Sequence, residues 1–240
     1  MTRKNYIKSL LPVYIIVLIS LVVASILTSK AVHTVAENTP IPDRKCIIID
    51  AGHGGVDGGA TSVSGMLESQ INLEIAIRLN DLMHLIGMDT RMIRTTDCSV
   101  YTEGESIAAK KVSDLKNRVR ITNETDNALL ISIHQNYFTD GKYDGAQVFY
   151  NKNDESKLLA NQLQAAFVKT LNPDSKRQAK KSNGIYLMEH IDCCGILVEC
   201  GFISNHEEDI KLQDPTYQKT LCSVICCTVS QFLYGRNTIT

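Results

Sequence analysis

The chain has 240 residues, of which 44% are hydrophobic and 21% charged, a composition typical of a globular protein with one domain and a short appendage. Its 25 lysines and arginines balance 26 acidic residues, and the basic residues that precede Val32 leave the remainder net negative. Because no basic stripe remains to contact phosphates, the composition argues against a nucleic-acid-binding protein.

The amino-terminal segment is apolar behind a basic start. No charged residue lies between Lys8 and Lys30, and as a helix this stretch would cross the roughly 30 Å hydrocarbon core of a bilayer. The basic residues before it predict a cytoplasmic amino terminus and export of everything that follows. Residues 1–34 are therefore expected to be a membrane anchor or a cleaved signal. The anchor is favoured because the apolar run exceeds that of most signal peptides. Residues 35–43 are expected to form a linker.

The eight cysteines show no disulfide framework, although export would permit one. Cys193-Cys194 and Cys226-Cys227 are adjacent pairs, and no Cys-x-x-Cys motif occurs. This spacing argues against a zinc site made of cysteines. Most of the cysteines are expected to be small buried side chains with free thiols.

Strand and helix signals alternate from residue 44 to residue 235. A β-branched run predicts a buried strand at 46–49, and apolar residues at 3.6-residue spacing predict a helix at 67–86. Further strands are expected at 90–93, 128–133, 145–150, 185–188 and 196–198, and further helices at 108–122, 156–171 and 217–232. A polar stretch, 172–183, is expected to be an exposed loop. This order predicts one α/β domain with a mixed, mostly parallel sheet flanked by helices, followed by a short tail at 236–240.

A glycine-rich loop follows the first strand. Residues 50–59 hold Asp50, His53 and Asp57 among five glycines, which allow positive φ angles or close approach of a ligand. Binding groups in open α/β sheets occur at the carboxyl ends of strands, where His53 lies. Taken alone, the loop is equally consistent with a simple turn that contains a hydrogen-bonded histidine.

Three more polar residues stand where the surrounding pattern is apolar. His134 and Glu199 each end an apolar strand, and Glu68 lies in the first turn of the inward face of the first helix. A carboxylate that faces a core needs a partner, and two histidines with one carboxylate are the ligands of many catalytic zinc sites. Structural explanations stay open, because Glu68 also suits a helix start and Glu199 could pair with Arg118.

These residues occur in segments that carry a resemblance to a known family. The segments are Ile49–Gly55, Glu68 with Asn72-Leu73, Asp114–Asn123, Ser132–Asn136 and Val198–Asn205. In this order, residues 44–235 resemble the zinc-dependent N-acetylmuramoyl-L-alanine amidases of the amidase-3 family. The resemblance implies the amidase-3 fold, zinc bound by His53, Glu68 and His134, and Glu199 as the catalytic residue.

The implied substrate is peptidoglycan, in which these enzymes hydrolyse the amide between the lactyl group of N-acetylmuramic acid and L-alanine of the stem peptide. Zinc is expected to polarise the scissile carbonyl and to activate water, with Glu199 as general base and then general acid. Asp50 is expected to orient a ligand histidine. Arg118 is expected to hold the loop structure in preference to binding a substrate carboxylate.

The combination of one membrane-directed segment and one catalytic domain resembles the sporulation and germination amidases that help to form muramic-δ-lactam in spore cortex. It implies action at the extracytoplasmic face of the membrane, in the cell wall or in the spore cortex. Gln135 and Cys194-Gly195 depart from the family pattern. A catalytically weak peptidoglycan-binding protein that needs an activating partner therefore stays an alternative, as does another zinc peptidase of the cell wall.

Overall fold

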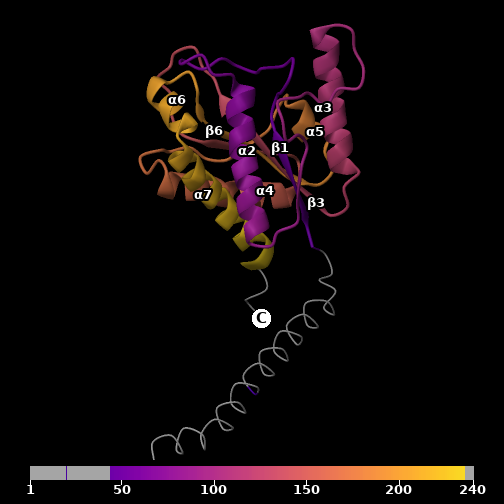
Figure 1. The fold of residues 1–240 in the computed structure, drawn as a ribbon. Helices are drawn as coiled ribbons and strands as arrows, with labels where there is room; N and C mark the ends of the chain where they lie inside the picture. Colours follow the sequence, from indigo (N-terminus) through magenta and orange to yellow (C-terminus); the bar gives the residue numbers. More distant parts are fainter. Residues whose placement is uncertain (1–19, 21–43, 236–240) are drawn as a thin grey trace, which may run out of the picture. The chain divides into compact units, whose positions relative to one another are not determined.

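A six-stranded sheet lies at the centre of the domain (Figure 1). Its strands are β1 (Cys46–Ala51), β2 (Thr90–Met92), β3 (Ala128–Asn136), β4 (Gln147–Tyr150), β5 (Lys180–Lys181) and β6 (Cys194–Phe202). The structure is a computed structural model that describes Ser20 and residues 44–235. The strand order is β2-β1-β3-β6-β4-β5, and every neighbouring pair is parallel except β4 with β6. The predicted mixed, mostly parallel sheet is confirmed.

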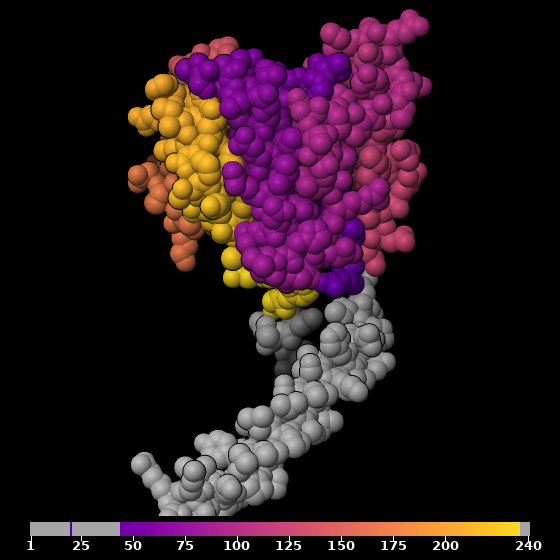
Figure 2. Space-filling view, in the orientation of Figure 1, coloured from indigo at the N-terminus to yellow at the C-terminus, as the bar shows by residue number. Residues whose placement is uncertain are grey.

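Helices cover both faces of this sheet. They are α2 (Glu68–Leu85), α3 (Ile107–Asn123), α4 (Asp154–Thr170), α5 (Tyr186–His190), α6 (His206–Gln213) and α7 (Pro215–Tyr234). Leu129 and Ile131 of β3 belong to the core that α2, α4 and α7 share, whereas Leu130 packs with residues of α5. Figure 2 shows α7 in yellow beside α2 in purple on the first of these faces. Alternate side chains of β3 thus contact the helices on opposite faces of the sheet.

The central strands form because their sequences are apolar on both sides. Residues 129–133 of β3 are all fully buried, as expected of a parallel strand covered by helices on both faces. In α2, Ile71, Ile75 and Leu79 recur at helical spacing and are also buried against the sheet. The predicted helices at 67–86, 108–122 and 156–171 are confirmed as α2, α3 and α4 with small shifts of their ends.

The strand predicted at 185–188 is wrong, because these residues lead into the helix α5. Leu187 and Met188 are both buried, although they are neighbours in sequence. A half-buried strand would place them on opposite faces, but one helical turn lets both contact the sheet. A four-residue apolar run does not carry enough periodicity to separate these two cases.

Two further elements lie in polar stretches where no element was predicted. The helix α6 begins after Asn205, whose side chain accepts hydrogen bonds from the backbone N–H groups of Glu207 and Glu208. Such capping stabilises a short polar helix without a strong apolar repeat. Within the predicted loop at 172–183, Lys180 and Lys181 pair with β4 as the edge strand β5.

The eight cysteines all lie within residues 44–235, and all are free thiols. Cys194, Cys200, Cys222 and Cys226 are buried. The predicted anchor or signal, the linker and the tail lie outside the described residues, apart from Ser20. In the part of the chain that the structure describes, no helix combines the length and hydropathy needed to cross a membrane.

Candidate active site and metal centre

His53 lies in the loop after β1 and is held on both sides. Its φ angle of 61° is in the left-handed region, which non-glycine residues rarely adopt. Its Nδ1 lies 2.9 Å from Oδ2 of Asp57, and Nη2 of Arg118 donates to its carbonyl oxygen at 2.7 Å. Its Nε2 then lies 3.3 Å from Oε1 of Glu68.

Glu68, the first residue of α2, is buried with both carboxylate oxygens engaged. Oε1 accepts hydrogen bonds from the backbone N–H of Gln135 at 3.2 Å and from Nδ2 of Asn72 at 3.3 Å. Oε2 accepts from the backbone N–H of Ala60 at 3.0 Å. Burial by itself raises the pKa of Glu68, but hydrogen bonds and charge interactions with His134 and His53 hold it well below its usual value. The carboxylate is therefore fixed in place and ionised.

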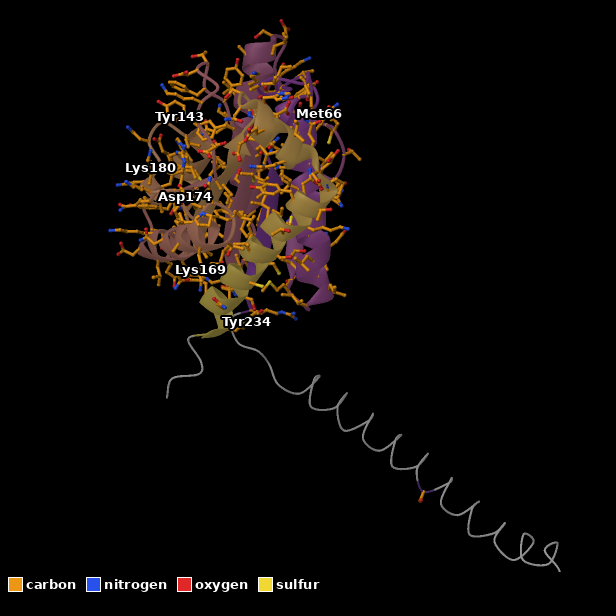
Figure 3. The ribbon with its side chains drawn as sticks, turned by 90° about the vertical axis from the view of Figure 1, so that its left-hand side faces the viewer. Met66, Tyr143, Lys169, Asp174, Lys180 and Tyr234 are labelled. Carbon is orange, nitrogen blue, oxygen red and sulfur yellow. The ribbon has the colours of Figure 1, made fainter. Side chains whose placement is uncertain are left out.

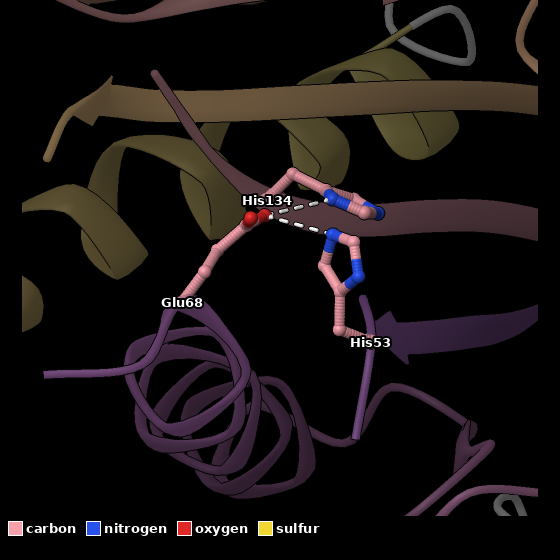
Figure 4. A group of neighbouring side chains, drawn as sticks. All are labelled: His53, Glu68 and His134. Carbon is pink, nitrogen blue, oxygen red and sulfur yellow. Dashed lines mark hydrogen bonds and ion pairs between the residues drawn. The ribbon is translucent and has the colours of Figure 1, made fainter. Parts of the chain in front are cut away.

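His134 of β3 completes a cluster of three possible metal ligands (Figure 4). Its Nδ1 lies 3.1 Å from Oε1 of Glu68. A Cβ atom on Gly52 would lie 2.2 Å from Nε2 and Cε1 of this ring, so only glycine leaves room for His134. Ligand atoms of His53, Glu68 and His134 lie within 4.8 Å of one another and could hold a metal ion. Two nitrogens and one carboxylate oxygen suit zinc.

The negative charge of Glu68 stabilises the protonated form of His53. Burial lowers the pKa of His53, but hydrogen bonds and charge interactions with Glu68 and Asp57 raise it to about 9. The imidazole rings of His53 and His134 lie 5.0 Å apart, centroid to centroid. Two imidazoles that converge on one carboxylate oxygen are attracted by its negative charge, and a bound cation would satisfy the same three groups.

Glu199 lies beside the cluster on β6. Its Cα atom is the register partner of that of His134, so both side chains project from the same face of neighbouring strands. Its Oε2 is buried and has no hydrogen-bond partner among the described residues. The pKa of Glu199 is raised to about 7, mainly by burial. The negative charge of Glu68 also raises this pKa, whereas His134 and His53 lower it. A carboxyl group with this pKa can exchange a proton at neutral pH.

The strands β3 and β6 continue beyond the ends that the sequence predicted. His134 and Glu199 therefore lie within strands and not after them. The register shifts between His134 and Asn136, which marks a bulge in the ladder directly beyond the paired residues. Bulges often occur next to active sites, where they change the direction of a side chain.

Arg118 connects α3 to β1 through an ion pair and a hydrogen bond. Its side chain is 2% exposed and pairs with Asp50 and Asp114, the latter with Nε at 2.6 Å from Oδ2. Its Nη1 also donates to the carbonyl oxygen of Ala51 at 2.9 Å. These contacts support the structural role expected for Arg118. Each of the three nitrogens of its guanidinium group has a hydrogen-bond partner within the protein, and the side chain also lines the cavity beside the histidines.

Asp50 forms its hydrogen bonds with Arg118 and Ser132 and not with a histidine of the cluster, contrary to the expected role. One oxygen binds Arg118, and the other accepts a hydrogen bond from Oγ of Ser132 at 2.6 Å. Asp50 reaches His53 only through Arg118, which donates to the His53 carbonyl oxygen. The side chain of Asp50 points to the face that α3 covers, and the sequence does not show which partner lies opposite.

The carboxylate beside Nδ1 of His53 belongs to Asp57, to which the sequence analysis assigned no role. Its second oxygen, Oδ1, lies 2.7 Å from Nζ of Lys111 on α3. Burial raises the pKa of Asp57, but Lys111 and His53 together lower it below its usual value. The four-residue spacing between His53 and Asp57 was the available signal, and the turn that joins them depends on the glycines of the loop.

A cavity of about 170 Å³ opens beside the two histidines. Its lining combines polar groups with an apolar wall of Leu115, Ile185, Leu187 and Leu197. Asp57 and Lys111 lie on the polar side. The cavity can therefore receive a substrate group that carries both an apolar and a polar part.

The sequence of the chain matches the family of N-acetylmuramoyl-L-alanine amidases, amidase-3, over residues 47–231. The germination-specific N-acetylmuramoyl-L-alanine amidase of Bacillus subtilis is 38% identical over 183 residues, which cover 75% of this chain and 76% of that protein. The family match does not include the amino-terminal segment, since it begins after the first residue of β1.

Solved structures share the fold. The CwlD amidase of Clostridioides difficile, solved in complex with the GerS lipoprotein, has a TM-score of 0.75 and 35% identity, covering 79% of this chain and 98% of that chain. An N-acetylmuramoyl-L-alanine amidase from Clostridium difficile 630 has a TM-score of 0.69 and 26% identity, covering 82% and 100%. With the family sequence matched over nearly all of the domain and the fold shared, the chain belongs to the amidase-3 family and is an N-acetylmuramoyl-L-alanine amidase that acts on peptidoglycan.

Proposed function

We propose that this amidase depends on zinc, with His53, Glu68 and His134 as metal ligands and Glu199 as the catalytic residue. The observation that carries the proposal is the convergence of three ligand atoms within 4.8 Å of one another. The unpartnered Oε2 of Glu199, on the strand beside His134, supports it. Three protein ligands leave the fourth position of a catalytic zinc site open for water or substrate.

The two carboxylates have different tasks in this proposal. Zinc held by His53, Glu68 and His134 would supply Lewis acidity to the scissile carbonyl and would activate water. Glu199 accepts the proton of the attacking water and passes it to the nitrogen of L-alanine as the C–N bond breaks. The lactyl group leaves as a carboxylate and the stem peptide as an amine. Glu68 stays ionised throughout, in agreement with its lowered pKa.

The proposed domain organisation places the chemistry outside the cytoplasmic membrane. Residues 44–235 form the catalytic domain, residues 1–34 the anchor or signal, residues 35–43 the linker and residues 236–240 the tail. Peptidoglycan lies on the outer side of that membrane, and a relative from Staphylococcus epidermidis is named a probable cell wall amidase. These observations support action in the cell wall or the spore cortex.

A role in spore cortex and an activating partner are further parts of the proposal. The Bacillus subtilis relative is named germination-specific, which supports a contribution to muramic-δ-lactam formation. The Clostridioides difficile amidase was solved with a lipoprotein bound, which supports a partner protein that promotes metal loading or activity. Spores that lack this chain should contain no muramic-δ-lactam, and unchanged lactam content would contradict the cortex role.

Product analysis tests the bond that is cleaved. Purified peptidoglycan is digested with the zinc-supplemented full chain, with and without the partner lipoprotein of the source organism, and the fragments are identified by mass spectrometry. We expect stem peptides with a free L-alanine amine and glycans with unsubstituted lactyl groups. Glu199→Gln should yield neither product at equal zinc content. Cleavage within the stem peptide would identify a zinc peptidase, and binding without cleavage in every sample would indicate a peptidoglycan-binding protein.

A further inference from the structure

A second, open groove lies at the same edge of the sheet as Glu199. Because β4 runs antiparallel to β6, Gln147 at the start of β4 is the register partner of Glu199. The groove measures about 550 Å³ and is lined by Asp144, Gln147 and residues 175–180. Figure 3 shows Lys180 with Tyr143 on this side of the molecule. The groove thus begins one strand away from the proposed catalytic residue.

Arg177 is held in this groove by two contacts, and no described residue forms an ion pair with it. Its Nε donates to the carbonyl oxygen of Asp144 at 3.0 Å, and its Cζ lies 4.9 Å from the ring centroid of Phe202. None of the ion pairs within the described residues involves this guanidinium. Both the ring and the carbonyl hold Arg177 in one orientation, so little side-chain entropy remains to be lost when it binds an anion.

The charges around Arg177 favour an anionic ligand. Lys176 and Lys180 line the same groove, and no ion pair among the described residues involves either of them. Asp144 is the acidic residue of the lining, and Asp174 is exposed nearby in sequence. Three cations therefore face one carboxylate in the lining, and an arginine fork is suited to bind a carboxylate through two hydrogen bonds.

The distance along β6 relates the groove to the substrate. Phe202 follows Glu199 by three residues, which is roughly 10 Å along a strand. An extended peptide of about three residues covers the same length. The stem peptide begins at the cleaved amide, and its second and third residues can carry free carboxylates that lie within this reach.

We infer that Arg177, assisted by Lys176 and Lys180, binds a carboxylate on the second or third residue of the stem peptide. This inference rests on the amidase function and identifies the part of the substrate that the enzyme recognises beyond the cleaved bond. Amidation of that carboxylate removes the negative charge, so the groove distinguishes free-acid from amidated stem peptides.

Equilibrium binding tests the inference without relying on catalysis. Two synthetic stem tripeptides that begin with L-alanine, one with free carboxylates on residues two and three and one with both amidated, are titrated into the full chain in EDTA by calorimetry. We expect the free acid to bind about tenfold more tightly. Arg177→Gln should remove most of this preference, and Arg177→Lys should retain part of it. Arg91→Gln, on the opposite edge strand β2, is the matched control and should retain all of it.

Equal affinity of the wild type for the two tripeptides would overturn the inference. So would an Arg177→Gln variant that is folded by circular dichroism and weakens both tripeptides equally, because a purely structural role affects both alike. If Arg177→Gln does not fold, Lys176→Gln with Lys180→Gln decides, since loss of these exposed charges should reduce the preference. Failure of the proposed zinc chemistry would appear in the peptidoglycan digestion and leave the titrations unaffected.

Discussion

At the scale of single residues, the orientation of His53 depends on Asp57. The hydrogen bond to Nδ1 directs Nε2 of the same ring toward Glu68. We expect Asp57→Asn to weaken zinc binding at least about tenfold, as loss of a carboxylate behind a metal-binding histidine typically does. Competition with a chromophoric chelator measures this, with Asp81→Asn on the exposed side of α2 as the control. Unchanged affinity in Asp57→Asn would show that the loop backbone alone orients His53.

A glycine makes room for the second histidine. Gly52→Ala places a methyl group 2.2 Å from the His134 ring, which must then leave its present position beside Glu68. We expect zinc affinity to fall by more than about tenfold and the free energy of unfolding to fall by about 1–3 kcal/mol, as for other overpacked sites. Gly235→Ala, where φ is −70° and no atom lies within 4 Å of the added carbon, controls for the loss of a glycine. Retained zinc affinity in Gly52→Ala would mean that His134 is not a ligand.

The sequence indicated His53, Glu68 and His134 because each polar residue stood in an apolar pattern at the start or end of an element. It did not indicate Asp57, and it assigned Asp50 to a histidine with which Asp50 forms no hydrogen bond. Both cases depend on which atoms face each other across a loop or between strands. Hydrophobic periodicity predicts the buried face of an element but not the hydrogen-bond partner of a given side chain.

At the scale of elements, Arg118 joins α3 to the carboxyl end of β1. Replacing it with methionine leaves Asp50 buried without its cationic partner, and Asp50 is 1% exposed. We expect Arg118→Met to lower the free energy of unfolding by about 3–5 kcal/mol, measured in denaturant. Arg120→Met is the matched control on the same helix. It removes an exposed pair with Glu124 and should cost less than about 1 kcal/mol. Equal losses would contradict the assigned role of Arg118.

Helices with a long apolar repeat were predicted from the sequence, whereas short helices without such a repeat were not. The helix α2 has four turns of apolar repeat and an acidic first residue, so its ends were placed within one residue. The five-residue helix α5 lacks such a repeat, and its partner is the sheet face around Leu130 and Leu197. Its type is therefore decided by tertiary packing, which the local sequence does not contain.

At the scale of the whole molecule, the buried carboxylates make stability depend on pH. Burial raises the pKa of Asp50, but Arg118 and Ser132 bring it below its ordinary value of 3.8. Because the folded pKa is the lower one, the stabilisation is present above pH 3.8 and is lost as pH falls through the folded pKa. In EDTA, the free energy of unfolding should therefore decrease between about pH 5 and about pH 2. Asp50→Asn should show a shallower decrease, and equal slopes would contradict this linkage.

The sheet topology positions the site, and only part of it was accessible from the sequence. Alternating strands and helices predicted a mostly parallel sheet, whose carboxyl edge collects His53 and His134. The register that pairs His134 with Glu199 was not predicted, because the order and alignment of distant strands follow from packing of the whole domain. The resemblance to a known family, and not the spacing, supplied the role of Glu199.

Zinc binding and amidase activity, measured together on three proteins, test the roles proposed for Glu68 as metal ligand and Glu199 as catalytic residue. The wild type, Glu68→Gln and Glu199→Gln are titrated with zinc and then incubated with purified peptidoglycan. We predict one zinc per chain and release of L-alanine-terminated stem peptides for the wild type, weakened zinc binding for Glu68→Gln, and full zinc binding without release for Glu199→Gln. Stem-peptide release by Glu199→Gln, or undiminished zinc affinity in Glu68→Gln, would contradict the proposed site.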